Sequence, residues 1–205
     1  MRANKEQNQQ EAAERAEQEA QEQINKQNDL IGNKKVADWA RNFVALAVKN
    51  GIVPETGLGD DYTKPITRAQ FCALGVKLYE TATGNAIAGR SSFDDTNDIN
   101  VEKLASLGVV NGYGNGKFGP NDTLTRAAAA TMLVKIADNL GIATTVKDTN
   151  FTDVASNHWA SEFIARVGSI GVMNGTSATT FHPENHYTIE QSIVTMYRLL
   201  MVNNA

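Results

Sequence analysis

The stretch HWASEFIARVGSIGVMNGTSATTFHPENHYTIEQSIVTMYRLL, residues 158–200, predicts two helices that a loop connects. Apolar residues in its first part recur at positions i, i+4, i+5, i+8 and i+11 and form one stripe along a helix: Trp159, Phe163, Ile164, Val167 and Ile170. Such a stripe is expected to be buried against another element. Gly171 and Val172 follow it, which is typical of a left-handed helix cap with a hydrophobic contact. The first helix should therefore end at this glycine.

The second helix of this stretch has its own start signal. A loop with glycine and proline, residues 174–185, ends shortly before Thr188. Thr188 and Gln191 are three residues apart, so the hydroxyl and the amide can each satisfy a free backbone N–H in a capping box. We therefore expect the second helix to begin at Thr188.

The same order of features occurs three times along the chain, at a spacing of about 58 to 63 residues. Gly51 and Gly108 occupy the place of the helix-ending glycine in the other two copies. The helices before these glycines are expected at residues 36–53 and 99–110, and the second helices at 65–80 and 123–141.

The other two copies also repeat the details of the start signal. Thr67 and Gln70 form a second capping box, whereas Thr125 keeps the cap with Ala128 in place of the glutamine. The apolar stripe of the first copy is made by Trp39, Phe43, Val44 and Ala47. A two-helix unit cannot bury such a stripe alone, so the units are expected to pack together.

We therefore predict an all-α fold with three helix–loop–helix repeats around a pseudo-threefold axis. The repeats are expected at about residues 31–84, 91–141 and 149–202, within one domain of residues 31–205. Residues 1–30 are rich in Glu, Gln and Ala and contain no Gly or Pro, which predicts a polar helix or a disordered arm. Alanines at three-four spacing make a poor coiled-coil seam, so a solvated arm is favoured over self-association, which stays open as an alternative.

Composition excludes several classes of partner. A net charge of -4 over 205 residues gives no broad basic field for nucleic acid or an anionic membrane. The single cysteine, Cys72, cannot form an internal disulfide and is expected to be a buried small apolar residue. No apolar run is long enough to cross a bilayer, and the N-terminus lacks a secretory signal pattern. A role outside the cell therefore requires that a signal peptide was removed or that the chain is part of a longer protein.

Two arginines lie where helix formation does not favour them. Arg68 and Arg126 follow the capping threonines, and a cation in the first turn opposes the helix dipole at a cost of about 0.3 to 1 kcal/mol. A single arginine of this kind is usually solvated or paired with an acid, but here the placement occurs twice. Arginine beside free backbone N–H groups can bind a carboxylate or a phosphate, so we predict that both contact a ligand.

These features together resemble the S-layer homology repeat of bacterial envelope proteins. Its order is Phe-x-Asp, Trp-Ala, a helix ending in Gly-Ile-Asn-Gly, Phe-x-Pro and Ile-Thr-Arg-Ala-Glu. The third repeat carries Phe151, Asp153, Trp159, Ala160, Gly171, Asn174, Gly175, Phe181, Pro183 and Thr188. The second carries Phe93, Asp95, Gly108, Asn111, Gly112, Phe118, Pro120, Thr125 and Arg126. The first carries Trp39, Ala40, Gly51, Ile66, Thr67, Arg68 and Ala69.

The resemblance implies a non-catalytic module at the cell surface, without a cofactor or a metal. It would bind an acidic cell-wall polysaccharide with pyruvylated sugars, in grooves between adjacent repeats. A pyruvate ketal carries the carboxylate that an arginine recognises, and an aromatic face can stack on a sugar. The ligand-binding residues expected from the resemblance are Arg68, Arg126, Asp95, Asp153, Trp39, Trp159, Asn111, Gly112, Asn174 and Gly175.

No repeat matches the pattern completely. The first has Asn33 in place of the aspartate, the second has no tryptophan, and the third has Ile189 where the arginine belongs. Some grooves are therefore expected to be inactive, unless neighbouring repeats supply each other's missing residues. Core packing is the alternative role for Trp39 and Trp159.

Two other classes of function are alternatives to this interpretation. An enzyme or a metal protein would need convergent ligands, but His182 and His186 flank a proline-containing loop, and only His158 adds to them. No phosphate loop or nucleophile elbow is present, and the run DDTNDIN at residues 94–100 lacks the pattern of a calcium loop. The alternative function is a degenerate repeat module for protein interaction or oligomerisation in the cell envelope.

Overall fold

The computed structural model describes residues 2–147 and 149–205. Within these residues the chain forms seven helices and no sheet, which confirms the all-α prediction. The helices are α1 (Arg2–Ile31), α2 (Asp38–Lys49), α3 (Arg68–Thr83), α4 (Ile99–Ser106), α5 (Arg126–Asn139), α6 (Ser161–Ser169) and α7 (Ile189–Asn203). None of the helices in this described part is both long and apolar enough to span a membrane.

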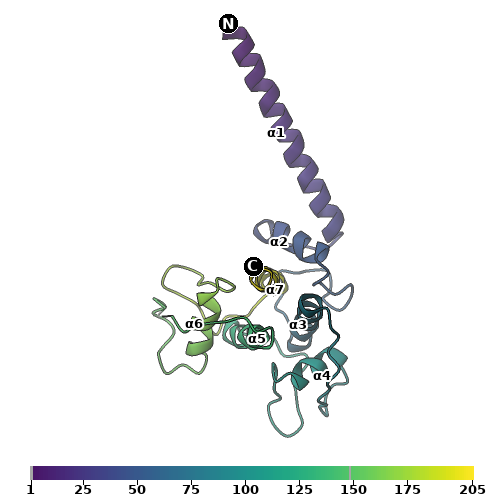
Figure 1. The fold of residues 1–205 in the computed structure, drawn as a ribbon, viewed down its shortest axis with the longest axis vertical. Helices are drawn as coiled ribbons and strands as arrows, with labels where there is room; N and C mark the ends of the chain where they lie inside the picture. The colour runs from purple at the N-terminus through teal and green to yellow at the C-terminus, as the bar shows by residue number, and fades with distance from the viewer. Residues whose placement is uncertain (1, 148) are drawn as a thin grey trace.

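Helix packing crosses the boundaries between the repeats. Figure 1 shows α3, α5 and α7 nearly end-on at the centre of the body, with α2, α4 and α6 around them. Two outer helices pack against the inner helix that precedes them along the chain, α4 on α3 and α6 on α5. The first outer helix, α2, packs on the last inner helix, α7, so the start and the end of the body are joined.

A ring of three hydrogen bonds holds the starts of the inner helices together. The backbone N–H of Ile66 donates to the Tyr187 carbonyl at 2.8 Å, and the Tyr187 N–H donates to the Leu124 carbonyl at 2.9 Å. The Leu124 N–H closes the ring on the Ile66 carbonyl at 3.0 Å. All three side chains are buried, and each residue directly precedes a capping threonine. The three inner helices therefore begin around one shared point.

The predicted helix ends are confirmed. Gly51, Gly108 and Gly171 have φ angles of 73°, 70° and 68°, the left-handed conformation that ends each outer helix. The capping boxes at the starts of α3 and α7 are both formed, and Thr125 caps α5 without a glutamine.

The interior follows most of the predicted apolar stripe, with one correction. Val44, Ala47 and Val167 are fully buried, as is Cys72, which confirms its apolar role. The two tryptophans at the start of the stripes are not buried, because Trp159 lies before α6 begins and Trp39 lies in the first turn of α2. Their exposed fractions are 60% and 53%, so the core-packing alternative for these rings is wrong.

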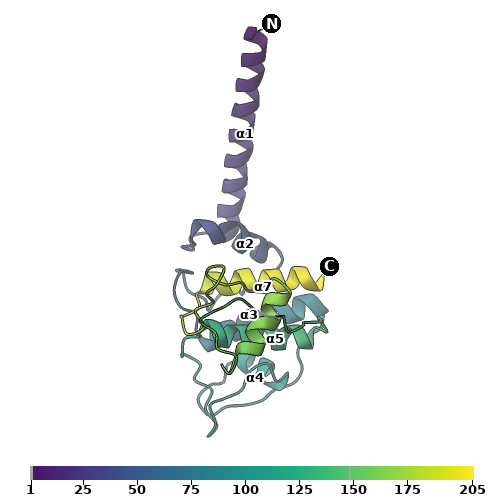
Figure 2. The same ribbon diagram turned by 90° about the vertical axis from the view of Figure 1, so that its left-hand side faces the viewer.

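The N-terminal segment is the long helix α1. It extends away from the other helices in both views and packs against α2 near its C-terminal end (Figures 1 and 2). Ile31, its last residue, is buried in the common core. Of the two predicted forms, the structure therefore shows the polar helix.

Candidate functional site

Arg68 binds the loop of the next repeat. Its Nε donates to the Phe118 carbonyl at 3.0 Å, and its Nη2 donates to the Asn111 carbonyl at 2.8 Å. The guanidinium also lies over the rings of Phe118 and Tyr113, at 4.4 and 4.7 Å from their centroids. The side chain thus fixes the 111–118 loop to the start of α3.

Arg126 makes the same contacts one repeat further along. Its Nε and Nη2 donate to the carbonyls of Phe181 and Asn174 at 2.7 and 2.8 Å, and the guanidinium lies 4.6 Å from the Phe181 ring centroid. Only 7% of this residue is exposed, and burial lowers the pKa of the Arg126 guanidinium. Each first-turn arginine therefore holds a neighbouring loop, a structural role that the sequence did not predict, and contact of either side chain with a ligand stays a prediction.

The backbone N–H groups beside these arginines are also occupied. The N–H groups of Arg68 and Ala69 donate to loop carbonyls of the next repeat, and those of Arg126 and Ala127 do the same, at 2.9 to 3.1 Å. The third N–H of each helix donates to the capping threonine. A combined arginine and free-amide receptor at these helix starts was predicted and is wrong, since the amides are bonded within the protein.

The two motif aspartates shape the same loops. Asp95 accepts from the N–H groups of Phe118 and Gly119 at 2.8 and 2.9 Å, and these bonds lower the pKa of its carboxyl. Asp153 accepts from Phe181 and His182 at 2.9 and 2.7 Å, and although partial burial raises its pKa, these bonds lower it overall. Both carboxylates therefore have a structural role that their motif does not reveal.

The glycines of the two Asn-Gly pairs are required by close backbone contacts. A Cβ atom on Gly112 would lie 2.4 Å from the Lys117 carbonyl oxygen, and one on Gly175 would lie 2.5 Å from that of Ser177. The preceding asparagines, Asn111 and Asn174, accept the arginine hydrogen bonds through their carbonyls. Their side chains are left free to face solvent, since both residues are exposed.

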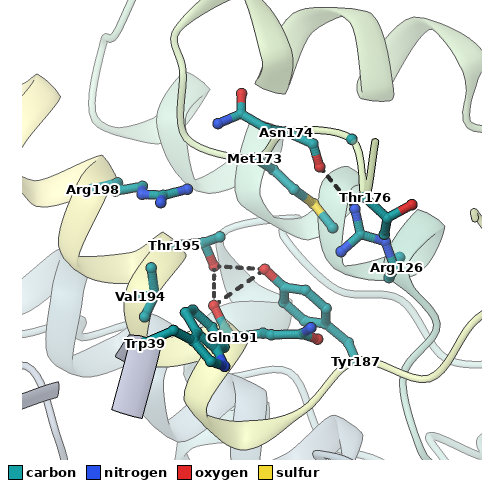
Figure 3. A pocket seen from close by; sticks show the side chains of 11 residues that line it. Trp39, Arg126, Met173, Asn174, Thr176, Tyr187, Gln191, Val194, Thr195 and Arg198 are labelled. Atoms are coloured by element: carbon teal, nitrogen blue, oxygen red, sulfur yellow. Dashed lines mark hydrogen bonds between the residues drawn. The ribbon is translucent and has the colours of Figure 1, made fainter. Parts of the chain in front are cut away.

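Trp39, Arg126 and Asn174 meet in one pocket, which we call groove A (Figure 3). Its cavity measures about 340 Å³. The pocket takes its tryptophan from the first repeat, its arginine from the second and its Asn-Gly pair from the third. In the view of Figure 3, Arg198 of α7 lies on the opposite side of the pocket from Arg126. The full lining is Trp39, Arg126, Met173, Asn174, Gly175, Thr176, Tyr187, Gln191, Val194, Thr195 and Arg198.

A second pocket, groove B, repeats this composition with the repeats permuted. Its cavity of about 180 Å³ combines Arg68 from the first repeat, Asn111 from the second and Trp159 from the third. The sequence suggested that a groove draws on two neighbouring repeats, but each of these grooves draws on all three. The full lining is Arg68, Val109, Val110, Asn111, Ala128, Thr131, Met132, Lys135 and Trp159.

A third pocket, groove C, lies at the remaining equivalent position, and the motif residues of grooves A and B are missing there. By analogy with grooves A and B, three parts of the chain should line groove C. Position 189 corresponds to the arginine, the start of the 53–57 loop corresponds to the Asn-Gly pair, and the segment before α4 corresponds to the tryptophan. These hold Ile189 for the arginine, Pro54 for the Asn-Gly pair, and no tryptophan. The pocket there measures about 800 Å³ and is lined by Pro54, Gln70, Lys77 and residues of α4, among others. Defects that are spread over three repeats thus fall together in one groove.

The sequence reasoning missed two cations, Arg198 and Lys135. Each lies nine positions after the first residue of its inner helix, and each lines a groove. Arg198 makes one long hydrogen bond, from Nη1 to the Val172 carbonyl at 3.4 Å, and its guanidinium lies 5.4 Å from the Phe43 ring centroid. Among the described residues, the Nζ of Lys135 has no hydrogen-bond or salt-bridge partner. The available signal was a cation that recurs at the same position of each inner helix between two apolar or aromatic neighbours, with Lys77 as the third example, in groove C.

The three histidines do not form one cluster, because each contacts different residues. His158 stacks on Trp159 with ring centroids 5.6 Å apart, and its Nε2 lies 3.2 Å from Glu184 Oε1. His182 and His186 each pair with a different threonine. Within residues 2–147 and 149–205, no group of three His, Cys, Asp or Glu side chains is placed to hold a metal ion.

Known proteins are similar to the parts of the chain that contain the two arginine-held loops. The family model described as the S-layer homology domain matches residues 92–130 and 150–188. A surface layer protein of Brevibacillus choshinensis is 34% identical over 49% of the chain and 9% of its own length. A cellulosome-anchoring protein of Acetivibrio thermocellus is 28% identical over 66% of the chain and 32% of its own length. An exoglucanase of Acetivibrio thermocellus is 26% identical over 86% of the chain, and the chain spans 16% of that protein.

Proposed function

Because the S-layer homology domain model matches residues 92–130 and 150–188, we propose that this chain attaches non-covalently to an acidic polysaccharide of the cell wall through grooves A and B. One observation carries the proposal above all others. An exposed tryptophan, an arginine-held Asn-Gly loop and a cation with unused donors come together twice, each time from three separate repeats. Such a repeated convergence is unnecessary for folding, since groove C lacks it.

In each groove, different side chains would have different roles in binding an acidic sugar. The first-turn arginine gives two of its five N–H donors to loop carbonyls and lies over the ring of a loop phenylalanine, so we assign it to positioning the loop. Arg198 in groove A and Lys135 in groove B have donors to spare, so they are the partners we propose for the carboxylate. Trp39 and Trp159 present exposed rings on which the apolar face of a sugar can stack.

The pyruvylated sugar is the ligand chemistry that fits this arrangement. Its ketal places a carboxylate beside a compact ring, and each groove pairs one cation that has unused N–H donors with one exposed tryptophan ring. Groove C keeps Lys77 but has neither the tryptophan nor the Asn-Gly loop, so we propose that it does not bind this ligand. The module would act at the cell surface. The names of two relatives, a surface layer protein and a cellulosome-anchoring protein, support this location.

Co-sedimentation with purified sacculi of the source organism tests the proposal. The protein is mixed with untreated sacculi and with sacculi from which mild acid has removed ketal-linked pyruvate. We expect binding to the untreated material and its loss after treatment. Absence of binding to untreated sacculi would overturn the proposal, and equal binding to both would overturn the role of pyruvate.

Assembly through α1 is a second candidate function. The helix spans 30 residues and extends away from the body, which is an arrangement suited to joining chains or a stalk (Figures 1 and 2). Light scattering at several concentrations distinguishes the two cases. A stable oligomer that is lost when residues 1–30 are deleted would favour assembly, whereas a monomer would argue against it.

A further inference from the structure

Tyr113 is an exposed aromatic residue at the edge of groove B that does not line its cavity. Its exposed fraction is 65%, larger than that of either tryptophan. The guanidinium of Arg68, which does line groove B, lies 4.7 Å from the centroid of the Tyr113 ring. The ring therefore continues the surface of the groove past the arginine.

The ring is held in place although it is exposed. A Cβ atom on Gly119 would lie 2.6 Å from Cε2 of Tyr113, so the ring is packed against a glycine that leaves room for it. Partial burial raises the pKa of the Tyr113 phenol, and a hydrogen bond to Asp122 adds to this effect. A ring that is already ordered loses little conformational freedom when a ligand binds to it.

Groove A lacks this feature. Thr176 stands two positions after Asn174, as Tyr113 stands two positions after Asn111. The Thr176 hydroxyl lies 2.6 Å from Nδ1 of His182, which replaces the glycine that makes room for the tyrosine. The two grooves thus share a cation and a tryptophan. Groove A is also lined by Tyr187, but that ring is only 1% exposed, so groove B is the one of the two with a second exposed aromatic ring.

We propose that Tyr113 is a sugar-binding platform that extends groove B, so that groove B binds at least two consecutive sugars of the polysaccharide and groove A binds one acidic sugar. The inference rests on the proposed function of the grooves. The cavity of groove B is the smaller of the two, so the additional sugar lies outside it, over the tyrosine ring. An amphipathic aromatic ring suits this contact because the apolar face of a sugar stacks on it.

Isothermal titration with wall fragments tests the proposal. Fragments that carry pyruvate are released from sacculi and sorted into one-sugar and three-sugar pools. Groove A is first inactivated with Trp39→Ala and Arg198→Ala, so that groove B is measured alone. We expect the three-sugar pool to bind this protein more tightly than the one-sugar pool, and Tyr113→Thr to weaken three-sugar binding by about two- to tenfold.

Three controls separate the outcomes. Tyr113→Thr should leave the affinity for the one-sugar pool unchanged, which would show that Arg68 and its loop stay in place. Tyr113→Phe should keep the tighter binding of the three-sugar pool. A further variant tests the reverse change in groove A. Groove B is inactivated by Trp159→Ala and Lys135→Ala, and Thr176→Tyr with His182→Gly is then added. This protein should bind the three-sugar pool more tightly than the one-sugar pool. Equal affinity for both pools, or no effect of Tyr113→Thr, would overturn the platform while leaving the grooves. No binding of any fragment to the unaltered protein would overturn both.

Discussion

Replacing Arg126 with alanine should lower the stability of the whole body, because this side chain joins two repeats. The change removes hydrogen bonds of 2.7 and 2.8 Å to the carbonyls of Phe181 and Asn174 and the contact with the Phe181 ring. Each hydrogen bond from a charged donor contributes about 1.5 to 3 kcal/mol net, and a buried carbonyl left without a donor adds a cost. Since one side chain makes all these contacts, we expect a loss of about 3 to 5 kcal/mol in the free energy of unfolding.

Equilibrium unfolding in urea, followed by circular dichroism, measures this loss. Arg126→Lys should recover little of it, because an ammonium cannot reproduce the two fixed directions of the guanidinium. Arg198→Ala is the matched control on the other side of groove A, and it should cost less than about 1 kcal/mol because its hydrogen bond is long. A loss below about 1 kcal/mol for Arg126→Ala would refute the structural role assigned to the first-turn arginines.

Three further predictions concern other parts of the fold. The carboxyls of Asp95 and Asp153 have a lowered pKa in the folded state, so the stability they contribute should be present above their ordinary value of 3.8 and lost as the pH falls through the lower folded values; Asp→Asn at both positions should flatten this acid limb in thermal unfolding, and an unchanged limb would contradict the assignment. Thr188→Ala should lower the free energy of unfolding in urea by about 1 kcal/mol through loss of the α7 cap, and an unchanged free energy of unfolding would contradict the role of the cap. Burial raises the pKa of the Cys72 thiol, so a thiol reagent should label it only after denaturant is added, and fast labelling of the native protein would show that this region opens.

The ends of the outer helices and the starts of the inner helices could be predicted from the sequence because their causes are local. A left-handed glycine at the end of a helix and a threonine with a glutamine three residues later act within one turn. Burial of the stripe could be predicted only in part. Periodicity identifies an apolar face, but it does not show where a helix begins, and Trp159 lies before the first residue of α6.

The roles of the arginines depended on partners that no local pattern identifies. Arg68 and the Phe118 carbonyl are 50 positions apart in the chain, and they meet because each loop docks on the preceding repeat's inner helix. The composition of the grooves was unpredictable for the same reason, since each combines three repeats. Arg198 and Lys135 could have been found, because both are cations nine positions after the first residue of an inner helix, each between two apolar or aromatic neighbours.

The most direct test of the two-groove account is co-sedimentation of two variants with pyruvate-bearing sacculi. One variant combines Lys135→Ala with Arg198→Ala, and the other carries Lys77→Ala at the equivalent position of groove C. With folding of both verified by circular dichroism, we predict that the double variant loses binding and that Lys77→Ala binds as the unaltered protein does. Full binding by the double variant, or a loss with Lys77→Ala alone, would contradict the account.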